Sequence, residues 1–184
     1  MICGLNRRRT MPGPHLMLAG AVSLALGVTV PAPAEPGLQT GKAAPNFKLT
    51  TLDGKAYQLQ AYRGKSVVVL DFGRLTCLPC RSVVSDLQKL QRKYRGKGVQ
   101  IFSVNLDGSL ACRVIPRGVQ EFGLTFPILV DKDYKVAEAY GCETIPYLVV
   151  VDSKGIVRWA HVGYETDLVT RLSQLIDKYR PKTK

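Results

Sequence analysis

The sequence has few residues of the kinds that bind metals or build disulfide frameworks. It contains five cysteines, two histidines and three methionines among 184 residues. Beyond residue 34 there remain four cysteines, one histidine (His161) and no methionine. Four cysteines are too sparse for a small disulfide-stapled fold. A structural zinc site needs four ligands, and the chain has a single Cys-x-x-Cys pair. We therefore expect no metal site.

The sequence also lacks an apolar run of ordinary membrane-spanning length. The uncharged run Leu16–Val30 covers fifteen residues, whereas a span needs about 20. The basic cluster Arg7–Arg9 precedes this run and Ala32-Pro33-Ala34 follows it, in the order typical of a secretory signal peptide. We expect residues 1–34 to be a cleaved signal peptide or, alternatively, an uncleaved N-terminal anchor. Residues 35–184 would then lie outside the cytoplasm, in the periplasm or on the outer face of the cytoplasmic membrane.

No internal repeat or low-complexity segment divides residues 35–184, a length that suits one domain with its own core. This part holds 23 basic and 14 acidic side chains. Such an excess can attract anionic lipid headgroups or acidic partners. Nucleic-acid binding would need basic residues gathered on one face with aromatic residues between them. The basic residues are scattered instead, so we expect no nucleic-acid partner and only weak electrostatic attraction to membranes.

The hydrophobic pattern predicts an α/β domain. Ser66–Phe72 and Val99–Val104 are apolar, β-branched runs, as expected for strands buried on both faces. Between them, apolar residues recur every three or four positions up to Gly96, which indicates a helix. A weaker helix, interrupted by Pro116, is expected after Val104. The other expected elements are a hairpin (Phe47–Leu52, Ala56–Leu59), strands over Ile128–Val130, Tyr147–Val151 and Ile156–Val162, and a C-terminal helix over Leu168–Tyr179. The order β-β-β-α-β-α-β-α-β-β-α predicts a mixed central sheet flanked by helices on both faces.

Cys77 and Cys80 fall where a buried strand ends and a helix begins. The first helical turn presents unpaired N–H groups and a partial positive charge, which lower the pKa of a thiol there and make it a nucleophile. We expect Cys77, at the helix start, to attack, and Cys80, one turn further and more buried, to resolve. Pro79 suits the first turn. A purely structural disulfide is disfavoured, because closing so short a loop gains little chain entropy.

A peroxide-reducing thiol is the nearest catalytic alternative. Peroxiredoxins resemble this chain up to the active-site strand and keep a threonine near their cysteine. Their motif resembles Thr-x-x-Cys after a proline. Here Thr76 directly precedes Cys77 and lies four residues before Cys80, and no proline precedes it. The spacing therefore disfavours a peroxidase.

From Leu38 to Tyr179 the chain resembles the TlpA/ResA-like thiol-disulfide oxidoreductases of the thioredoxin superfamily. The matching features are the segments GKAAPNFKLTTL and YRGKSVVVLDF, the Cys77–Cys80 pair, the Thr144-Ile145-Pro146 loop, and a closing hairpin with Gly155 and Gly163. Two positions depart from the family pattern. Thr76 stands where a tryptophan usually precedes the first cysteine, and Gly73 stands where an aromatic residue is common. The hydrophobic platform beside the sulfur is expected to be thinner for that reason.

The resemblance implies a thioredoxin-like fold and an exported enzyme that reduces disulfides of other exported proteins. Cytochrome c maturation or copper-site assembly would be the setting, with an upstream membrane thiol donor and no cofactor. A cis Ile145–Pro146 bond is implied, which would expose the Ile145 backbone for pairing with a substrate chain. The alternative function is a non-catalytic module that holds copper through the cysteines, although such sites usually recruit Met or His.

Asp71 lies six residues before Cys77, at the position of thioredoxin's buried acid. A buried carboxyl has a raised pKa and can exchange the proton of Cys80. The structural alternative is a strand-end aspartate that caps a neighbouring N–H.

Cys112 and Cys142 are packing thiols or a second pair. Small buried thiols are common packing residues, and an oxidising compartment permits a second disulfide. We expect both near the active-site end of the sheet and near each other, with two free thiols favoured over a bond.

Overall fold

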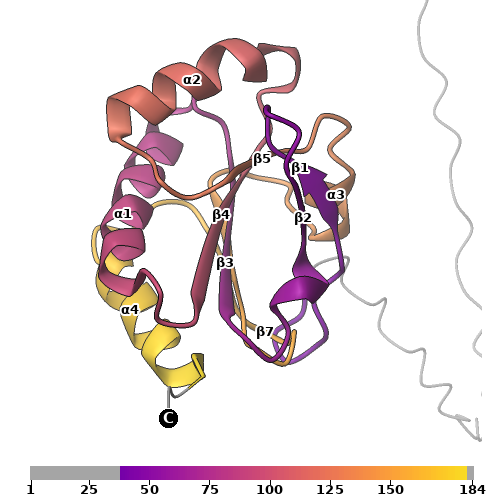
Figure 1. Cartoon of the computed structure of the whole chain (residues 1–184), viewed down its shortest axis with the longest axis vertical. Helices are drawn as coiled ribbons and strands as arrows, with labels where there is room; N and C mark the ends of the chain where they lie inside the picture. Colours follow the sequence, from indigo (N-terminus) through magenta and orange to yellow (C-terminus); the bar gives the residue numbers. More distant parts are fainter. Residues whose placement is uncertain (1–37, 182–184) are drawn as a thin grey trace, which may run out of the picture. The chain divides into compact units, whose positions relative to one another are not determined.

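The computed structural model describes residues 38–181, which form one seven-stranded sheet covered by helices (Figure 1). Across the sheet the strands follow the order β2-β1-β5-β4-β3-β6-β7. Their bounds are β1 Lys48–Thr50, β2 Ala56–Gln58, β3 Val67–Gly73, β4 Val99–Asn105, β5 Ile128–Val130, β6 Tyr147–Val151 and β7 Val157–Val162. Strands β3, β4 and β5 are parallel to one another, while β1, β6 and β7 run antiparallel to the strands they pair with. The sheet is mixed, as the sequence predicts.

The helices lie on both faces of the sheet, which confirms the predicted fold class. They are α1 Leu78–Tyr94, α2 Ala111–Phe122, α3 Lys135–Ala139 and α4 Leu168–Tyr179, with 3-10 turns η1 Leu59–Tyr62 and η2 Gly108–Leu110. Residues of α1, α2 and α4 share one hydrophobic core, and Ala137 of α3 belongs to the core on the opposite face. Figure 1 shows α1 and α4 along one side of the sheet and α3 on the other.

Strand β3 is buried along its whole length because both of its faces are covered. Val67 and Val69 point into the core beneath α1 and α4, while Leu70 and Phe72 point into the opposite core, as the two-residue period of a strand requires. Each such side chain, fully buried, stabilises the fold by about 1.5–3 kcal/mol. The carboxyl end of β3, from which the cysteine pair follows, is therefore rigidly supported.

Helix α1 forms where the spacing predicts it. Val83, Leu87 and Leu90 of its apolar face are fully buried against the sheet. The helix ends at Tyr94, two residues before Gly96, which adopts a left-handed conformation with φ of 72°. The chain leaves the helix at Arg95, whose backbone is extended (ψ 124°), and Gly96 completes a turn in which the Lys97 N–H donates to the Tyr94 carbonyl at 3.0 Å. Glycine tolerates the left-handed conformation of this turn without a steric penalty.

The interruption predicted at Pro116 is wrong, because α2 is continuous through it. A proline inside a helix removes one backbone donor and crowds the preceding turn. The apolar face of α2 nevertheless packs firmly, with Ala111, Ile115 and Gly118 buried. At Gly118 a Cβ atom would approach Leu75 Cδ1 to 2.7 Å. This close tertiary contact supports the helix despite its weak local sequence.

The expected signal peptide or anchor, residues 1–34, lies outside the described residues. Among residues 38–181, no helix combines the length and the hydrophobicity that crossing a membrane would require.

Candidate active site

Cys77 and Cys80 form a disulfide at the junction of β3 and α1, with their Cα atoms 5.3 Å apart. Cys77 is the N-cap of α1 and its Sγ accepts the backbone N–H of Cys80 at 3.4 Å. Pro79 lies in the first turn, where its missing N–H costs little. Cys77 is half-buried, whereas Cys80 is only 1% exposed. One sulfur is thus accessible to a partner and the other is shielded, as expected from the sequence.

Asp71 is buried behind this pair, at 1% exposure. Its Oδ2 accepts a hydrogen bond from the Ser103 hydroxyl at 3.1 Å, and its Oδ1 has no partner among residues 38–181. Burial raises the pKa of Asp71 to about 7, and the Ser103 hydrogen bond opposes this only in part. A carboxyl group with this pKa both takes up and releases a proton near neutral pH.

Gly73 separates Asp71 from Cys80. A Cβ atom on Gly73 would lie 3.4 Å from Cys80 Sγ and 3.6 Å from Asp71 Oδ1. Cys80 Sγ and Asp71 Oδ1 are therefore at most 7.0 Å apart. Asp71, Gly73, Cys80 and Ser103 line one small void. The Asp71 carboxyl group and the Cys80 sulfur therefore line the same small void, which makes Asp71 the candidate proton acceptor for Cys80.

The Ile145–Pro146 peptide bond is cis, as the family resemblance implies. This loop leads into β6, whose first residue, Tyr147, pairs with Phe72 of β3. The Pro146 carbonyl accepts the Gly163 N–H at 2.8 Å. Within residues 38–181, neither the N–H nor the carbonyl of Ile145 has a hydrogen-bond partner. The Ile145 backbone is thus available to pair with another chain.

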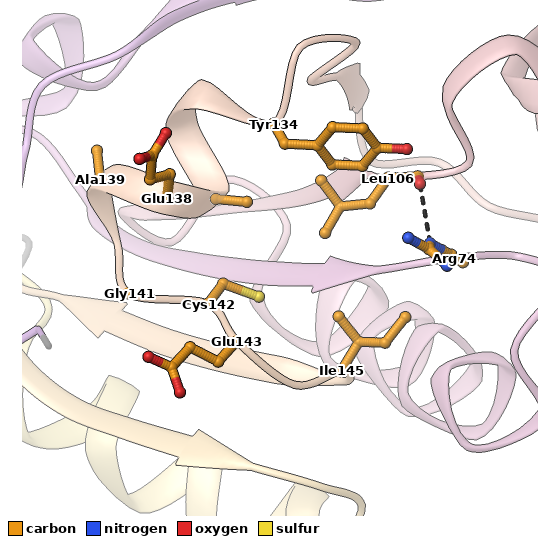
Figure 2. Close-up of a pocket in the computed structure, with 10 residues that line it drawn as sticks. Arg74, Leu106, Tyr134, Glu138, Ala139, Gly141, Cys142, Glu143 and Ile145 are labelled. Carbon is orange, nitrogen blue, oxygen red and sulfur yellow. Dashed lines mark hydrogen bonds between the residues drawn. The ribbon is translucent and has the colours of Figure 1, made fainter.

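A pocket of about 730 Å³ adjoins this loop (Figure 2). Its lining residues are Arg74, Leu106, Tyr134, Ala137, Glu138, Ala139, Gly141, Cys142, Glu143 and Ile145. Arg74, from the loop before the cysteines, donates its Nε–H to the Leu106 carbonyl at 2.9 Å. Figure 2 shows the Cys142 thiol pointing toward the part of the pocket where Ile145 and Arg74 lie. The pocket connects the cysteine loop with the cis-proline loop.

Cys112 and Cys142, the possible second pair, are both free thiols within residues 38–181. Cys112 is exposed, while Cys142 is half-buried in the pocket beside the cis-proline loop. Burial, with smaller contributions from the charges of Asp71 and Asp131, raises the pKa of Cys142 to about 11. A thiol with this pKa is almost entirely protonated at neutral pH and is a poor nucleophile.

Sequence reasoning missed two polar residues at this end of the sheet, Asn105 and Asp107. Both are buried. The Asp107 carboxylate accepts hydrogen bonds from Asn105 and from the two residues that precede Cys77. The sequence does carry a signal for them. Both residues come just after the predicted strand Val99–Val104, which is parallel to the strand before the cysteines. The carboxyl ends of parallel neighbours meet at one edge of a sheet.

Residues 38–181 contain no group of three or more His, Cys, Asp or Glu side chains placed to hold a metal ion.

The chain is similar to known redox proteins over most of its length. The model of the AhpC/TSA family matches residues 40–160. The thiol-disulfide oxidoreductase ResA of Bacillus anthracis is 34% identical over 151 residues, covering 82% of this chain and 85% of the relative. ResA of Halalkalibacterium halodurans is 32% identical over 166 residues, covering 88% and 93%.

Solved structures agree with these sequence relatives. A Chlorobium tepidum protein, assigned as the thiol:disulfide interchange protein DsbE, has a TM-score of 0.70 at 29% identity, covering 78% of this chain and 99% of that one. StoA from Bacillus subtilis has a TM-score of 0.59 at 22% identity, covering 71% and 96%, and supports the fold alone.

Proposed function

This chain belongs to the AhpC/TSA family and is a thiol-disulfide oxidoreductase of the ResA-like, thioredoxin-fold type, and we propose that it works outside the cytoplasm by reducing disulfides of exported proteins. The observation that carries the proposal is the Cys77–Cys80 disulfide at the start of α1, with one accessible and one buried sulfur. The extracytoplasmic location is supported by the signal-like order of residues 1–34.

The reduced enzyme begins the reaction through Cys77. Its thiolate attacks one sulfur of the partner's disulfide, the partner's S–S bond breaks, and the departing sulfur leaves as a thiolate that takes a proton. Cys77 is then joined to the partner in a mixed disulfide. The N–H groups of the first turn of α1 stabilise the attacking thiolate.

Cys80 completes the reaction. It loses its proton and attacks Cys77 Sγ, which forms the intramolecular disulfide and releases the second partner sulfur as a thiolate. Two electrons have then passed from the enzyme dithiol to the partner. Asp71, with a pKa of about 7 and its free Oδ1 beside Cys80, takes the Cys80 proton in this step.

The substrate chain is held beside Cys77 by the Ile145 backbone, whose polar groups have no partner within residues 38–181. A membrane-bound thiol donor outside the cytoplasm restores the dithiol. The direction of transfer follows from the reduction potential of the pair relative to its compartment. A strongly negative measured potential supports the reductase, and a potential like that of a strong oxidant would reverse the direction.

Single cysteine variants test the assignment. Cys77→Ser should abolish reduction of insulin disulfides, whereas Cys80→Ser should accumulate mixed disulfides with partner proteins, visible on non-reducing gels. Cys112→Ser, at an exposed free thiol, is the matched control and should keep wild-type turnover. Full turnover by Cys80→Ser, or trapping by Cys77→Ser, would contradict the roles of attacking and resolving thiol. Stoichiometric copper retention after dialysis, without reductase activity, would support the copper-binding alternative.

A further inference from the structure

A buried carboxylate underlies the loop that carries Cys77. Asp107 is 8% exposed. Its Oδ2 accepts the Leu75 backbone N–H at 2.8 Å and the Asn105 side-chain amide at 2.7 Å. Its Oδ1 accepts the Thr76 hydroxyl at 2.7 Å. Both oxygens are therefore committed, and they bind the two residues immediately before the nucleophile.

Asp107 is itself fixed to the sheet. Its backbone N–H donates to Asn105 Oδ1 at 3.1 Å, and Asn105 stands opposite Gly73 in the parallel β3–β4 pair. The neighbouring Leu106 N–H donates to the Gly73 carbonyl at 2.9 Å. Within residues 38–181 Asp107 forms no ion pair, and its carboxyl oxygens are held by the hydrogen bonds from Leu75, Thr76 and Asn105. Buried carboxylates need such compensation.

We infer that Asp107 is a positioning residue for the nucleophile, acting through Leu75 and Thr76. Cys77 caps α1 with an extended backbone, φ −95° and ψ 122°, and in this conformation its Sγ accepts the Cys80 N–H. The two hydrogen bonds to Asp107 fix one backbone group and one side chain of the preceding loop, so they hold Cys77 in this conformation. The inference rests on the proposed role of Cys77 as the attacking thiol.

Thr76 gains a function in this arrangement. Its hydroxyl is the side-chain link between the loop and the Asp107 carboxyl group. Misplacing a reacting atom by about 1 Å costs on the order of a hundredfold in rate. Hydrogen bonds that orient a reacting group are accordingly worth more to activity than to stability.

Asp107 could affect Cys77 through its charge or through the hydrogen bonds that position the loop, and the two modes change the Cys77 pKa in opposite directions. A nearby carboxylate acting through its charge raises the pKa of a thiol, so its removal would make Cys77 more acidic. A carboxylate acting through position keeps the thiolate within reach of the α1 N–H groups, so its removal would make Cys77 less acidic. The other charged groups that line the surroundings of this loop are Asp71, Arg74, Arg81, Arg117 and Glu121. They stay unchanged when Asp107 or Thr76 is replaced, so their effects cancel in the comparison.

Four variants separate the two cases. Asp107→Ala and Thr76→Val remove the hydrogen bonds. Asp107→Asn and Thr76→Ser keep groups able to form them, the first without the charge. Thr51→Val is the matched control, since Thr51 also bonds an aspartate, Asp53, but in the β1–β2 turn, with β5 and β4 between that hairpin and β3.

The measurements use the reduced protein. The rate of Cys77 carboxymethylation is followed by peptide mass spectrometry across pH, alongside insulin turnover and the urea midpoint. Asp107→Ala and Thr76→Val should raise the apparent pKa of Cys77 and lower turnover by about ten- to a hundredfold. Asp107→Asn and Thr76→Ser should stay within about threefold of wild type, as Thr51→Val does.

Equal behaviour of Asp107→Ala and Asp107→Asn, with a lowered Cys77 pKa in both, would overturn the inference in favour of a charge effect. Turnover of Thr76→Val at the control level would also overturn it. If Asp107→Ala fails to fold, the Thr76→Val and Thr76→Ser pair still decides. If only the inference about Asp107 is wrong, Cys77→Ser should still be inactive in the insulin assay. If the proposed function itself is wrong, Cys77→Ser should still turn over.

Discussion

Replacing Asp71 by asparagine should make the oxidised protein's stability less dependent on pH. The raised pKa of Asp71 means that the folded state binds its proton more tightly than the unfolded chain does. The contribution of Asp71 to stability is therefore complete below about pH 4 and is lost as the pH rises through about 7. Asparagine cannot ionise, so the variant should not show this loss.

The magnitude follows from proton linkage. The folded pKa is about 7 and the reference value is 3.8. With these values the cost of ionising Asp71 in the folded state grows by about 2–3 kcal/mol between pH 5 and pH 8. Asparagine also places an amide where Oδ1 lacks a partner within the described part of the chain, at a cost of about 1–3 kcal/mol that is the same at every pH. The change with pH, and not the absolute difference, is the diagnostic quantity.

Urea unfolding of the oxidised proteins from pH 4.5 to pH 8.5 measures this change. The free energy of unfolding of Asp71→Asn, relative to wild type, should rise across this wider range by about 3 kcal/mol. Asp133→Asn, at an exposed position, serves as the control and should follow the wild-type profile. A constant difference between Asp71→Asn and wild type would refute a buried, titrating carboxyl at this position.

Three further predictions concern the site and the core. Gly73→Ala places a methyl group 3.4 Å from Cys80 Sγ, so it should destabilise the protein by about 1–3 kcal/mol and prolong the lifetime of the mixed disulfide on non-reducing gels. Unchanged stability and turnover would contradict the tight approach of Gly73 to Cys80. Cys142, whose burial raises its pKa from 9.0 to about 11, should be alkylated at pH 7.5 about a hundredfold more slowly than an unperturbed thiol; equal rates for Cys142 and the exposed Cys112 would speak against its burial. Leu172→Ala, at a fully buried position of α4, should cost about 2–5 kcal/mol in urea unfolding while the folded fraction keeps its turnover, and a loss below about 1 kcal/mol would show that α4 packs loosely.

The sequence predicts the elements because their signals are local. Tyr147–Val151 and Ile128–Val130 are strands within the predicted bounds, and β3 shows the burial on both faces that its unbroken apolar run indicates. The prediction failed at Pro116, where local chemistry opposes a helix. Packing of Gly118 against Leu75, 43 positions earlier in the chain, supports the helix there, and no local pattern reports a contact between residues so far apart.

The active site likewise has features that the sequence predicts and features that only the tertiary structure decides. Sequence alone determined the cysteine pair, its place at a strand-to-helix junction and the exposed and buried ends of the pair, because two residues of spacing and one helical turn fix them. The register of parallel β3 and β4 decided what stands around the pair: it sets Ser103 opposite Asp71 and Asn105 opposite Gly73. That register brings the Asp107 carboxylate beneath Leu75 and Thr76. These partners are about 30 residues apart in the chain, and their hydrogen bonds exist only once the sheet has formed, since tertiary packing and not local preference places one strand beside another.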